Sequence, residues 1–333
     1  MPDANPPPAT GLHMQATSCA WCGKRQSVAL FERPDTLTAL SGLFKLVRCT
    51  TCGVIRQDPR PSTSDLQAYY PEHYSTYEPM IDEERFPWTR WQRRYGMWKR
   101  LRLIDRYQSP GRLLDVGAGT GIFLAEAARG GWQVTGLEPT PAAAQHAATR
   151  LGSAVITARF DQVEFPAGSF DVVTMWNVLE HVERPLDDLK RAGRLLRPGG
   201  LLALSVPSLE AWEARVFGRA WIGWDMPRHL YLFPVHVLRE MLKASGFELL
   251  TKRCLAGGHA TLELSLTSRL YRWRARHPRR FAVIMAVYRS WPVRLILAFP
   301  LWVAARLERG TLLTLVARRL PTFEQEQAVL DTP

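Results

Sequence analysis

The stretch Leu113-Leu114-Asp115-Val116-Gly117-Ala118-Gly119-Thr120-Gly121 decides the fold. It begins in a short apolar run, Arg112–Val116, and leads into Ile122–Arg129, whose apolar spacing is typical of a helix. Glycine at every second position lets the backbone turn tightly, and it lets a ligand approach without meeting a Cβ atom. In an open α/β sheet, such a turn lies at the carboxyl end of a strand, where ligands bind.

A carboxylate follows the second predicted strand. Gln133–Leu137 is apolar and β-prone, and Glu138 stands 17 residues beyond Gly121. A carboxylate at this place can accept both hydroxyl protons of a ribose. A glycine-rich turn alone indicates only a sharp strand-to-helix connection. Together, the turn, its flanking elements and Glu138 predict a nucleoside-cofactor site.

Strands and helices alternate after Gly111. Further strands are predicted at Ala154–Thr157, Phe170–Met175, Leu201–Val206, Phe247–Lys252 and Thr311–Val316, and further helices at Pro141–Leu151, Leu186–Leu196 and Val235–Ser245. Such alternation requires a parallel sheet covered by helices on both faces. The expected fold is therefore α/β, with a doubly wound, mostly parallel, seven-stranded sheet.

The glycine spacing separates two cofactor classes. Dinucleotide enzymes favour Gly-x-Gly-x-x-Gly, whereas this turn is Gly-x-Gly-x-Gly preceded by Asp115. That pattern resembles the first motif of class I S-adenosylmethionine-dependent methyltransferases, with a domain of the type-11 or type-23 kind. The resemblance covers about residues 111–254 and continues through Ser169–Val173, Asn177–Val182, Leu195–Gly200, Asp225–Leu230 and Ala244–Phe247.

The resemblance implies a set of cofactor contacts. They are Asp115, Gly117, Gly119, Gly121 and Glu138. Ala118 of the same turn is a further expected cofactor contact, and Asn177 would position the methionine part of the cofactor or the acceptor. Many members place an acid beyond the third strand to contact the adenine amine, but Arg159 stands there in this chain. The adenine would instead meet Phe160 or be reached by Asp161, and both alternatives stay open.

Two histidines are candidates for the catalytic base. A methyl acceptor must be aligned with the sulfonium methyl group and, where necessary, lose its proton. His181 follows the fourth strand, where an acceptor would approach, and His229 lies in the Asp225–Leu230 motif. Imidazole titrates near neutral pH. Either histidine could equally have a structural role.

Two Cys-x-x-Cys-Gly units predict a metal site near the N-terminus. Cys19, Cys22, Cys49 and Cys52 supply four thiolates, which favour a closed, tetrahedral and structural Zn²⁺. We therefore expect a zinc ribbon over residues 19–57. Cys254 stands alone, and a buried small hydrophobic role is the simpler interpretation.

The ribbon and the segment after it carry a second resemblance. Asp58-Pro59-Arg60-Pro61 and the tyrosine-rich residues that follow are similar to the N-terminal part of a bacterial methyltransferase subgroup. Members of that subgroup are associated with sugars and other secondary-metabolic acceptors. The resemblance implies acceptor contacts at Tyr70, His73 and Tyr74. Trp224 is a further expected acceptor contact.

The 333 residues suffice for two or three domains. We expect a disordered lead (1–18), the ribbon (19–57), a connector and lid-like helix (58–107), the methyltransferase domain (108–320) and a tail (321–333). The lead lacks the cationic start and apolar core of a signal peptide, so a cytoplasmic protein is expected.

A basic helical insertion is expected at residues 260–309. Residues 250–320 contain 14 Lys and Arg residues and only two acidic residues, Glu263 and Glu308. This segment therefore carries a formal charge of +12, which equals the net charge of the whole chain. Its longest uncharged run, Leu295–Ala305, has 11 residues, too few for a transmembrane helix. A helix lying on a membrane surface, a dimer surface and a substrate cap all stay open, and the oligomeric state is not determined.

Methyl transfer to a small molecule is the leading functional hypothesis, with a sugar, a lipid-linked saccharide or a secondary metabolite as the acceptor. The glycine spacing disfavours a nicotinamide-dependent oxidoreductase. A nucleic-acid methyltransferase or RNA binder is the main alternative, because zinc ribbons and basic aromatic surfaces occur in such proteins. The positive charge lies in an apolar insertion rather than a polar arm, which weighs against it. A non-catalytic scaffold at a membrane is a third class.

Overall fold

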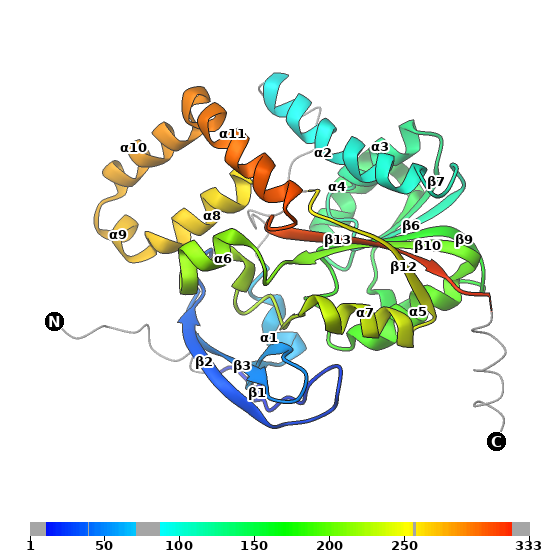
Figure 1. Cartoon of the computed structure of the whole chain (residues 1–333), viewed down its shortest axis with the longest axis horizontal. Coiled ribbons are helices and arrows are strands. Elements are labelled where there is room, and N and C mark those ends of the chain that lie inside the picture. Colours follow the sequence, from blue (N-terminus) through cyan, green and yellow to red (C-terminus); the bar gives the residue numbers. More distant parts are fainter. Residues whose placement is uncertain (1–10, 39, 71–86, 256–257, 322–333) are drawn as a thin grey trace. The chain divides into compact units, whose positions relative to one another are not determined.

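The computed structural model describes residues 11–38, 40–70, 87–255 and 258–321 (Figure 1). The chain divides into two compact units. The ribbon unit comprises Met1–Tyr74, Pro207–Val237 and Arg253–Leu313, and the sheet unit comprises Ser75–Val206, Leu238–Lys252 and Thr314–Pro333. These units describe packing, so the domain limits expected from the sequence remain predictions.

A seven-stranded sheet with the order β12-β13-β10-β9-β6-β7-β8 forms the core of the sheet unit. The strands are β6 (Arg112–Val116), β7 (Gln133–Leu137), β8 (Val155–Ile156), β9 (Phe170–Trp176), β10 (Leu196–Pro207), β12 (Phe247–Arg253) and β13 (Leu312–Arg319). Neighbouring strands from β10 through β9, β6 and β7 to β8 pair in parallel. The predicted α/β fold with a mostly parallel sheet is confirmed.

The central strands are apolar on both faces. In β9, Val172 and Val173 point to opposite faces, yet both have 0% exposure. Helices must therefore cover the sheet on both sides, and Figure 1 shows α3 and α4 on one side with α5 and α7 on the other. The helices of this unit are α2 (Pro87–Asp105), α3 (Ile122–Arg129), α4 (Pro141–Leu151), α5 (Pro185–Leu195) and α7 (Val235–Ala244), with short 3-10 turns η2 (Gly152–Ala154) and η3 (Phe160–Gln162).

The predicted elements agree with the observed ones, with differences at their ends. The expected strand Ala154–Thr157 is reduced to two residues, because a 3-10 turn occupies Gly152–Ala154. Strand β10 begins at Leu196 rather than Leu201, since Leu196 pairs with Phe170 ahead of a register irregularity. Helix α2 falls within the segment 58–107, where the sequence predicts a connector and lid-like helix, and it carries a stacked, exposed aromatic row of Trp91, Tyr95 and Trp98.

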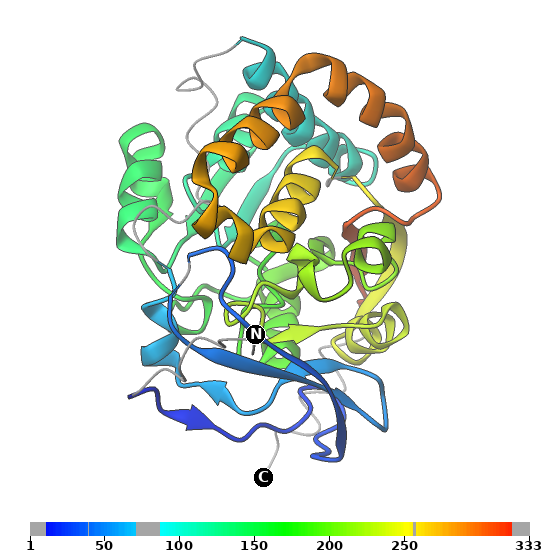
Figure 2. The ribbon, with the colours of Figure 1, turned by 90° about the vertical axis from the view of Figure 1, so that its left-hand side faces the viewer.

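The ribbon unit contains a four-stranded antiparallel sheet with the order β11-β4-β3-β2. Its strands are β2 (Ser27–Pro34), β3 (Leu43–Cys49), β4 (Ile55–Gln57) and β11 (Tyr231–Leu232). Figure 2 shows β2 and β3 in blue. The fourth strand comes from a distant part of the sequence, with Tyr231 opposite Arg56. The ribbon therefore completes its sheet with a segment outside the predicted range 19–57.

Part of the expected disordered lead is ordered. Met14–Gln15 forms β1, which pairs with β5 (Arg60–Pro61). The backbone N–H of His13 donates to the Asp65 carboxylate at 2.7 Å, and that of Thr17 donates to Asp58 at 2.9 Å. These carboxylates lie in the connector segment 58–107, so the sequence of the lead alone does not reveal them. Residues 1–10 lie outside the described range.

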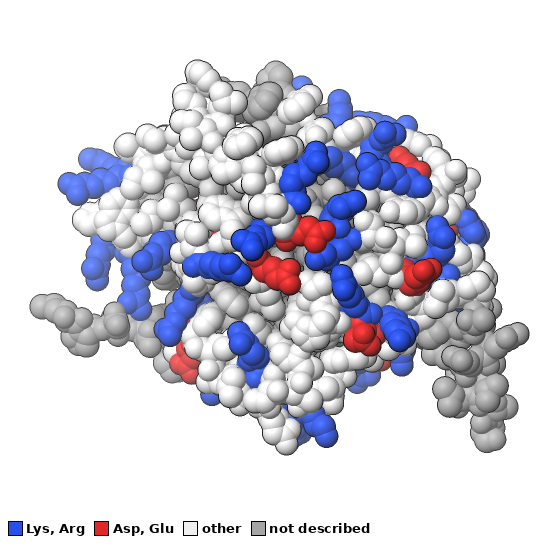
Figure 3. Space-filling model, viewed as in Figure 1, with Lys and Arg blue, Asp and Glu red and all other residues white. Residues whose placement is uncertain are grey.

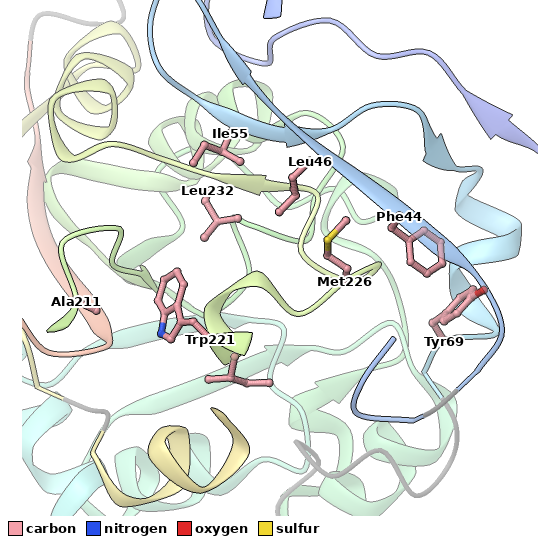
Figure 4. Close-up of a cluster of buried hydrophobic side chains, with 9 residues drawn as sticks. Phe44, Leu46, Ile55, Tyr69, Ala211, Trp221, Met226 and Leu232 are labelled. Atoms are coloured by element: carbon pink, nitrogen blue, oxygen red, sulfur yellow. The ribbon is translucent and has the colours of Figure 1, made fainter. Parts of the chain in front are cut away.

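The core of the ribbon unit combines residues from two distant parts of the sequence, residues 44–69 and residues 211–232. Figure 4 shows Leu46 and Ile55 of the ribbon near Leu232, and Phe44 beside Tyr69, all in one buried cluster that also includes Trp221. The polar connections in this core have the same origin. Gln57 Nε2 donates to the carbonyls of Pro227 and His229, both at 2.7 Å. The segment 207–237 is thus an integral part of the ribbon's packing.

A buried arginine reinforces this packing. The Arg228 guanidinium has 0% exposure and donates to the carboxylates of Asp35 and Asp225. It also donates to the Tyr69 carbonyl at 3.1 Å. Buried charges are tolerated when they are paired and hydrogen-bonded in this way.

The remaining helices belong to the ribbon unit. They are α1 (Thr63–Gln67), α6 (Trp212–Phe217), α8 (His259–Arg269), α9 (Tyr271–Arg276), α10 (Pro278–Arg289) and α11 (Trp291–Arg306), with 3-10 turns η4 (Gly218–Ala220) and η5 (Ile222–Trp224). The predicted insertion is thus mostly helical, with breaks between the helices at Leu270, His277 and Ser290. None of the described helices alone has the length and apolarity to cross a bilayer; α10 and α11 meet that test only as a pair, bent by 62°.

Candidate functional site

The glycine turn at the carboxyl end of β6 has a left-handed backbone. The φ angles of Gly117, Gly119 and Gly121 are +72°, +55° and +80°. Residues with a Cβ atom rarely adopt this region, so the alternating glycines are required by the course of the chain.

Packing separates the roles of the three glycines. A Cβ atom on Gly117 would lie 2.6 Å from Val178 Cγ2, and one on Gly121 would lie 2.9 Å from Ala147 Cβ. A Cβ atom on Gly119 would meet no described atom within 4 Å. Two glycines therefore allow close packing inside the protein, whereas Gly119 leaves one face of the turn bare.

Glu138 joins the end of β7 to this turn. Its side chain is buried, with 4% exposure, and its carboxylate accepts the backbone N–H of Gly119 at 2.8 Å. The other carboxylate oxygen accepts the N–H of Thr140 at 2.9 Å. Burial raises the pKa of Glu138, and these two hydrogen bonds oppose that effect. The structure thus brings together the turn and the acid predicted from the sequence.

Asp115 lies in the sheet directly before the turn. Its side chain is buried and accepts a hydrogen bond from Thr174 Oγ1 at 2.5 Å. Burial raises the pKa of Asp115 to about 7, although the Thr174 hydrogen bond lowers it. A carboxyl group with this pKa changes charge near neutral pH.

The loop after β9 contacts the same turn. Val178 limits the space at Gly117, as described above, and its carbonyl accepts the N–H of His181 at 2.9 Å. Asn177 has a φ of +57°, and its Oδ1 accepts the Ser205 hydroxyl at 2.6 Å. The structure therefore places Asn177 and His181 on a loop that packs against the glycine turn.

The expected adenine contacts follow β8. Phe160 is buried in η3, with the Arg191 guanidinium 5.6 Å from the centre of its ring. Asp161 is exposed and accepts hydrogen bonds from Arg159 at 3.0 and 3.2 Å. That pairing lowers the pKa of Asp161. Arg159, the departure from the family pattern, thus neutralises the neighbouring acid.

The remaining predicted residues belong to the ribbon unit. His229 is buried and its Nδ1 lies 2.8 Å from the Gly223 carbonyl, while burial lowers its pKa. Trp224 donates from Nε1 to the Gly218 carbonyl at 2.9 Å and packs edge-on against Phe31. Tyr70 is half-buried at the end of the described stretch 40–70. His73 and Tyr74 lie outside the described residues.

The four predicted metal ligands are close together. The sulfur atoms of Cys19, Cys22, Cys49 and Cys52 all lie within 4.8 Å of one another. The Cys19 and Cys52 sulfurs are 3.4 Å apart, and those of Cys22 and Cys49 are 3.5 Å apart. This spacing fits one ion at the centre of the four thiols.

The two Cys-x-x-Cys-Gly turns have the same hydrogen bonds. Gly23 donates to the Cys19 carbonyl at 2.9 Å, and Gly53 donates to the Cys49 carbonyl at 3.0 Å. Each glycine has a positive φ, +70° and +80°. Burial raises the pKa of Cys49, but backbone N–H groups of Cys52 and Thr51 bring it down to about 6. These N–H groups favour a thiolate at Cys49, the form that binds metals, whereas burial raises the pKa values of Cys19 and Cys52.

With this geometry established, comparison with known proteins identifies the catalytic domain. A family model described as a methyltransferase domain matches residues 88–252. The chain contains a methyltransferase domain. The mostly parallel sheet, in which β6 and the glycine turn lie between β9 and β7, agrees with that assignment.

Relatives match part of this chain over part of their own length. The ubiquinone biosynthesis O-methyltransferase of Sodalis glossinidius is 36% identical over 127 residues, which are 35% of this chain and 50% of the relative. The protein of the same name from Xanthomonas campestris is 36% identical over 149 residues, 42% of this chain and 60% of the relative. The chain thus spans half to three fifths of the length of these relatives.

Among solved structures, a putative sarcosine dimethylglycine methyltransferase from Galdieria sulphuraria is similar over 77% of this chain and 98% of its own length. The sequence identity is 15% and the TM-score is 0.48. The fold assignment of the methyltransferase domain rests on its own strand order and on the family match.

Two residues of the site were missed from the sequence. Thr174 lies in a strand otherwise apolar at its centre, and it is the residue paired in register with Asp115. A lone threonine within an apolar strand was a signal, but its partner becomes visible only with the register. Val178 was included in a motif, although its packing against Gly117 was not anticipated.

Asp115 predicts a measurable pH dependence of stability. Its pKa of about 7 exceeds the value of about 3.9 expected in an unfolded chain, so the native state binds more protons between about pH 4 and pH 7. Stability should therefore fall as pH rises through this window. Asp115→Asn should show a smaller fall in urea unfolding followed by circular dichroism. Parallel stability curves for the two proteins would contradict the assignment.

Proposed function

We propose that this chain transfers a methyl group from S-adenosylmethionine to a small-molecule acceptor. The observation that carries the proposal is the bare glycine turn of β6, bound through Gly119 to the buried Glu138 of β7. The match of residues 88–252 to a methyltransferase domain supports it.

The residues at the turn fit an adenosyl ligand. Gly119 offers backbone without a side chain, and no described atom would be within 4 Å of a Cβ atom added there. The Glu138 carboxylate accepts the backbone N–H groups of Gly119 and Thr140 on separate oxygens and a further hydrogen bond from the Thr140 side chain. Two carboxylate oxygens offer about four lone pairs, so acceptor capacity remains for a ribose hydroxyl. Asp115, Ala118 and Asn177 would hold the amino-acid portion of the ligand. Phe160 or Asp161 would meet the adenine.

The reactive chemistry comes from the cofactor, whose sulfonium makes the methyl group electrophilic. The protein must hold the acceptor in line and accept a proton where the acceptor carries one. His181 is the first choice for that base, because its loop packs against the glycine turn. His229 is the second choice. Its lowered pKa favours a neutral ring, and donation from Nδ1 to Gly223 leaves Nε2 unprotonated in that ring.

A sugar, a lipid-linked saccharide or a secondary metabolite is the proposed acceptor class. The relatives that match the domain are named for methylation of a small molecule in ubiquinone biosynthesis. The aromatic and histidine side chains of Tyr70, His73, Tyr74 and Trp224 are the proposed acceptor contacts. Such groups combine apolar contact area with hydrogen-bonding tips, as small-molecule sites require.

We further propose a structural Zn²⁺ at Cys19, Cys22, Cys49 and Cys52. Four sulfur ligands from two identical turns leave no open position for catalysis. The sheet of β2, β3 and β4 is small, and a metal would stabilise the end of it where both turns lie.

Binding of S-adenosylhomocysteine tests the cofactor assignment. Isothermal titration should show binding of this ligand and not of NAD. Glu138→Ala should weaken binding by about 1–3 kcal/mol, because it removes the buried acceptor of the ribose hydroxyls. Glu248→Ala, which removes an exposed carboxylate from β12, is the matched control and should bind normally.

The binding results test the proposed activity and the role of Glu138 separately. Failure of the natural chain to bind S-adenosylhomocysteine would refute the proposed activity. Normal binding by Glu138→Ala would refute only the role of Glu138. With labelled S-adenosylmethionine and fractionated metabolites, label in a small molecule supports the acceptor class, and label in RNA would overturn it.

Metal analysis tests the zinc proposal. The purified chain should contain about one equivalent of zinc, and the double variant Cys19→Ser/Cys22→Ser should lose it. Cys254→Ser is the matched control, because Cys254 is buried beside Gly310 and lies outside the four-cysteine cluster. Absence of zinc from the natural chain, or its retention by the double variant, would refute the site.

A further inference from the structure

The helices α10 and α11 each have an apolar face that packs inward. Phe281, Met285 and Tyr288 of α10 join Leu262 of α8 in a small core. Val293 and Leu297 of α11 pack against the same core. The Tyr288 hydroxyl donates to the His259 carbonyl at 2.6 Å, which fixes α10 against the start of α8. These contacts account for one face of each helix.

Each helix also has a second apolar face that points away from this core. We call it the outer face. Its members are strongly exposed, and Trp291, Ile296 and Phe299 have 76%, 72% and 70% exposure. The full set is Val283, Ile284, Val287, Trp291, Leu295, Ile296, Phe299 and Trp302. A soluble helix normally places polar residues opposite its packed face, so a contiguous apolar surface here indicates an interaction site.

The charged residues of α10 and α11 themselves are all cationic, although Arg289 is paired with Glu263 of α8. Between Pro278 and Arg306 the sequence contains five arginines and no acidic residue. Arg279 and Arg280 are exposed at the start of α10, and Arg306 lies over the Trp302 ring at 4.8 Å. Figure 3 shows a largely white surface over α10 and α11, with blue side chains along the left margin.

We propose that the outer face of α10 and α11 docks on the surface of an anionic lipid bilayer. Apolar side chains would enter the boundary between headgroups and acyl chains, while arginines meet lipid phosphates. Trp291 and Trp302 suit that boundary, because indole combines an apolar body with an N–H donor. The bend of 62° between the helices and the core under them favour contact with one leaflet.

Charge complementarity selects the bilayer over other occupants. Two copies of the outer face would bring arginine against arginine in a symmetric dimer, which electrostatic repulsion disfavours. A nucleic acid binds chiefly through contacts of Lys and Arg with its phosphates, and the centre of the outer face is apolar rather than basic. An anionic membrane satisfies both the apolar centre and the basic margin, and this inference is independent of the methyl acceptor.

Co-sedimentation with vesicles tests the proposal on the full chain. The chain should sediment with vesicles of equal parts phosphatidylglycerol and phosphatidylcholine, and much less with pure phosphatidylcholine. Trp291→Ser/Phe299→Ser should reduce the partition coefficient by at least about tenfold, because it removes two large apolar side chains from the bilayer contact. Arg279→Gln/Arg280→Gln should weaken binding to the anionic vesicles selectively.

Val216→Ser/Val28→Ser is the matched control, because these exposed valines of α6 and β2 lie away from the outer face, with 67% and 51% exposure. It should bind vesicles as the natural chain does. Circular dichroism and S-adenosylhomocysteine binding confirm that each variant is folded. Equal sedimentation of the natural chain and Trp291→Ser/Phe299→Ser would overturn the proposal. So would an absence of vesicle binding together with a dimer that this variant abolishes.

Discussion

The hydrogen bond from the Gly119 backbone to the Glu138 carboxylate is the contact on which the site depends. It links the turn after β6 to the residue after β7, and these strands are parallel neighbours whose carboxyl ends lie at one edge of the sheet. Gly117 and Gly121 let the loop after β9 and helix α4 pack closely against the turn. The bare backbone of Gly119 is thereby held beside a buried acid.

Local sequence patterns predicted most of the sheet unit, because each strand and helix there has its own periodicity and its own end signals. Helix α4 begins at Pro141 as predicted, and β6 and β7 have their predicted bounds. The ribbon was harder to predict from local patterns, because its fourth strand, β11, and the hydrogen-bond partners of Gln57 come from the distant residues 227–232. The hydrogen bond of Thr174 with Asp115 likewise depends on strand register, which local patterns do not encode.

The chain therefore combines three features: a glycine turn beside buried acids, a four-cysteine cluster, and a pair of exposed apolar helices. The sheet unit offers bare backbone and buried carboxyl groups at the carboxyl ends of β6 and β7. The ribbon unit fixes four thiols by two identical glycine turns and ties them to a distant segment through Gln57 and Arg228. Helices α10 and α11 expose apolar and cationic side chains together. Only the glycine turn and its buried acids are proposed to bind the cofactor, so each of the three features can be tested without the others.

A crystal structure of the chain with S-adenosylhomocysteine would test the central claim most directly. The account predicts that the ligand lies against residues 115–121, with its ribose hydroxyls donating to Glu138. Ligand density at any other place on the chain, or a ribose bound without the Glu138 carboxylate, would contradict it.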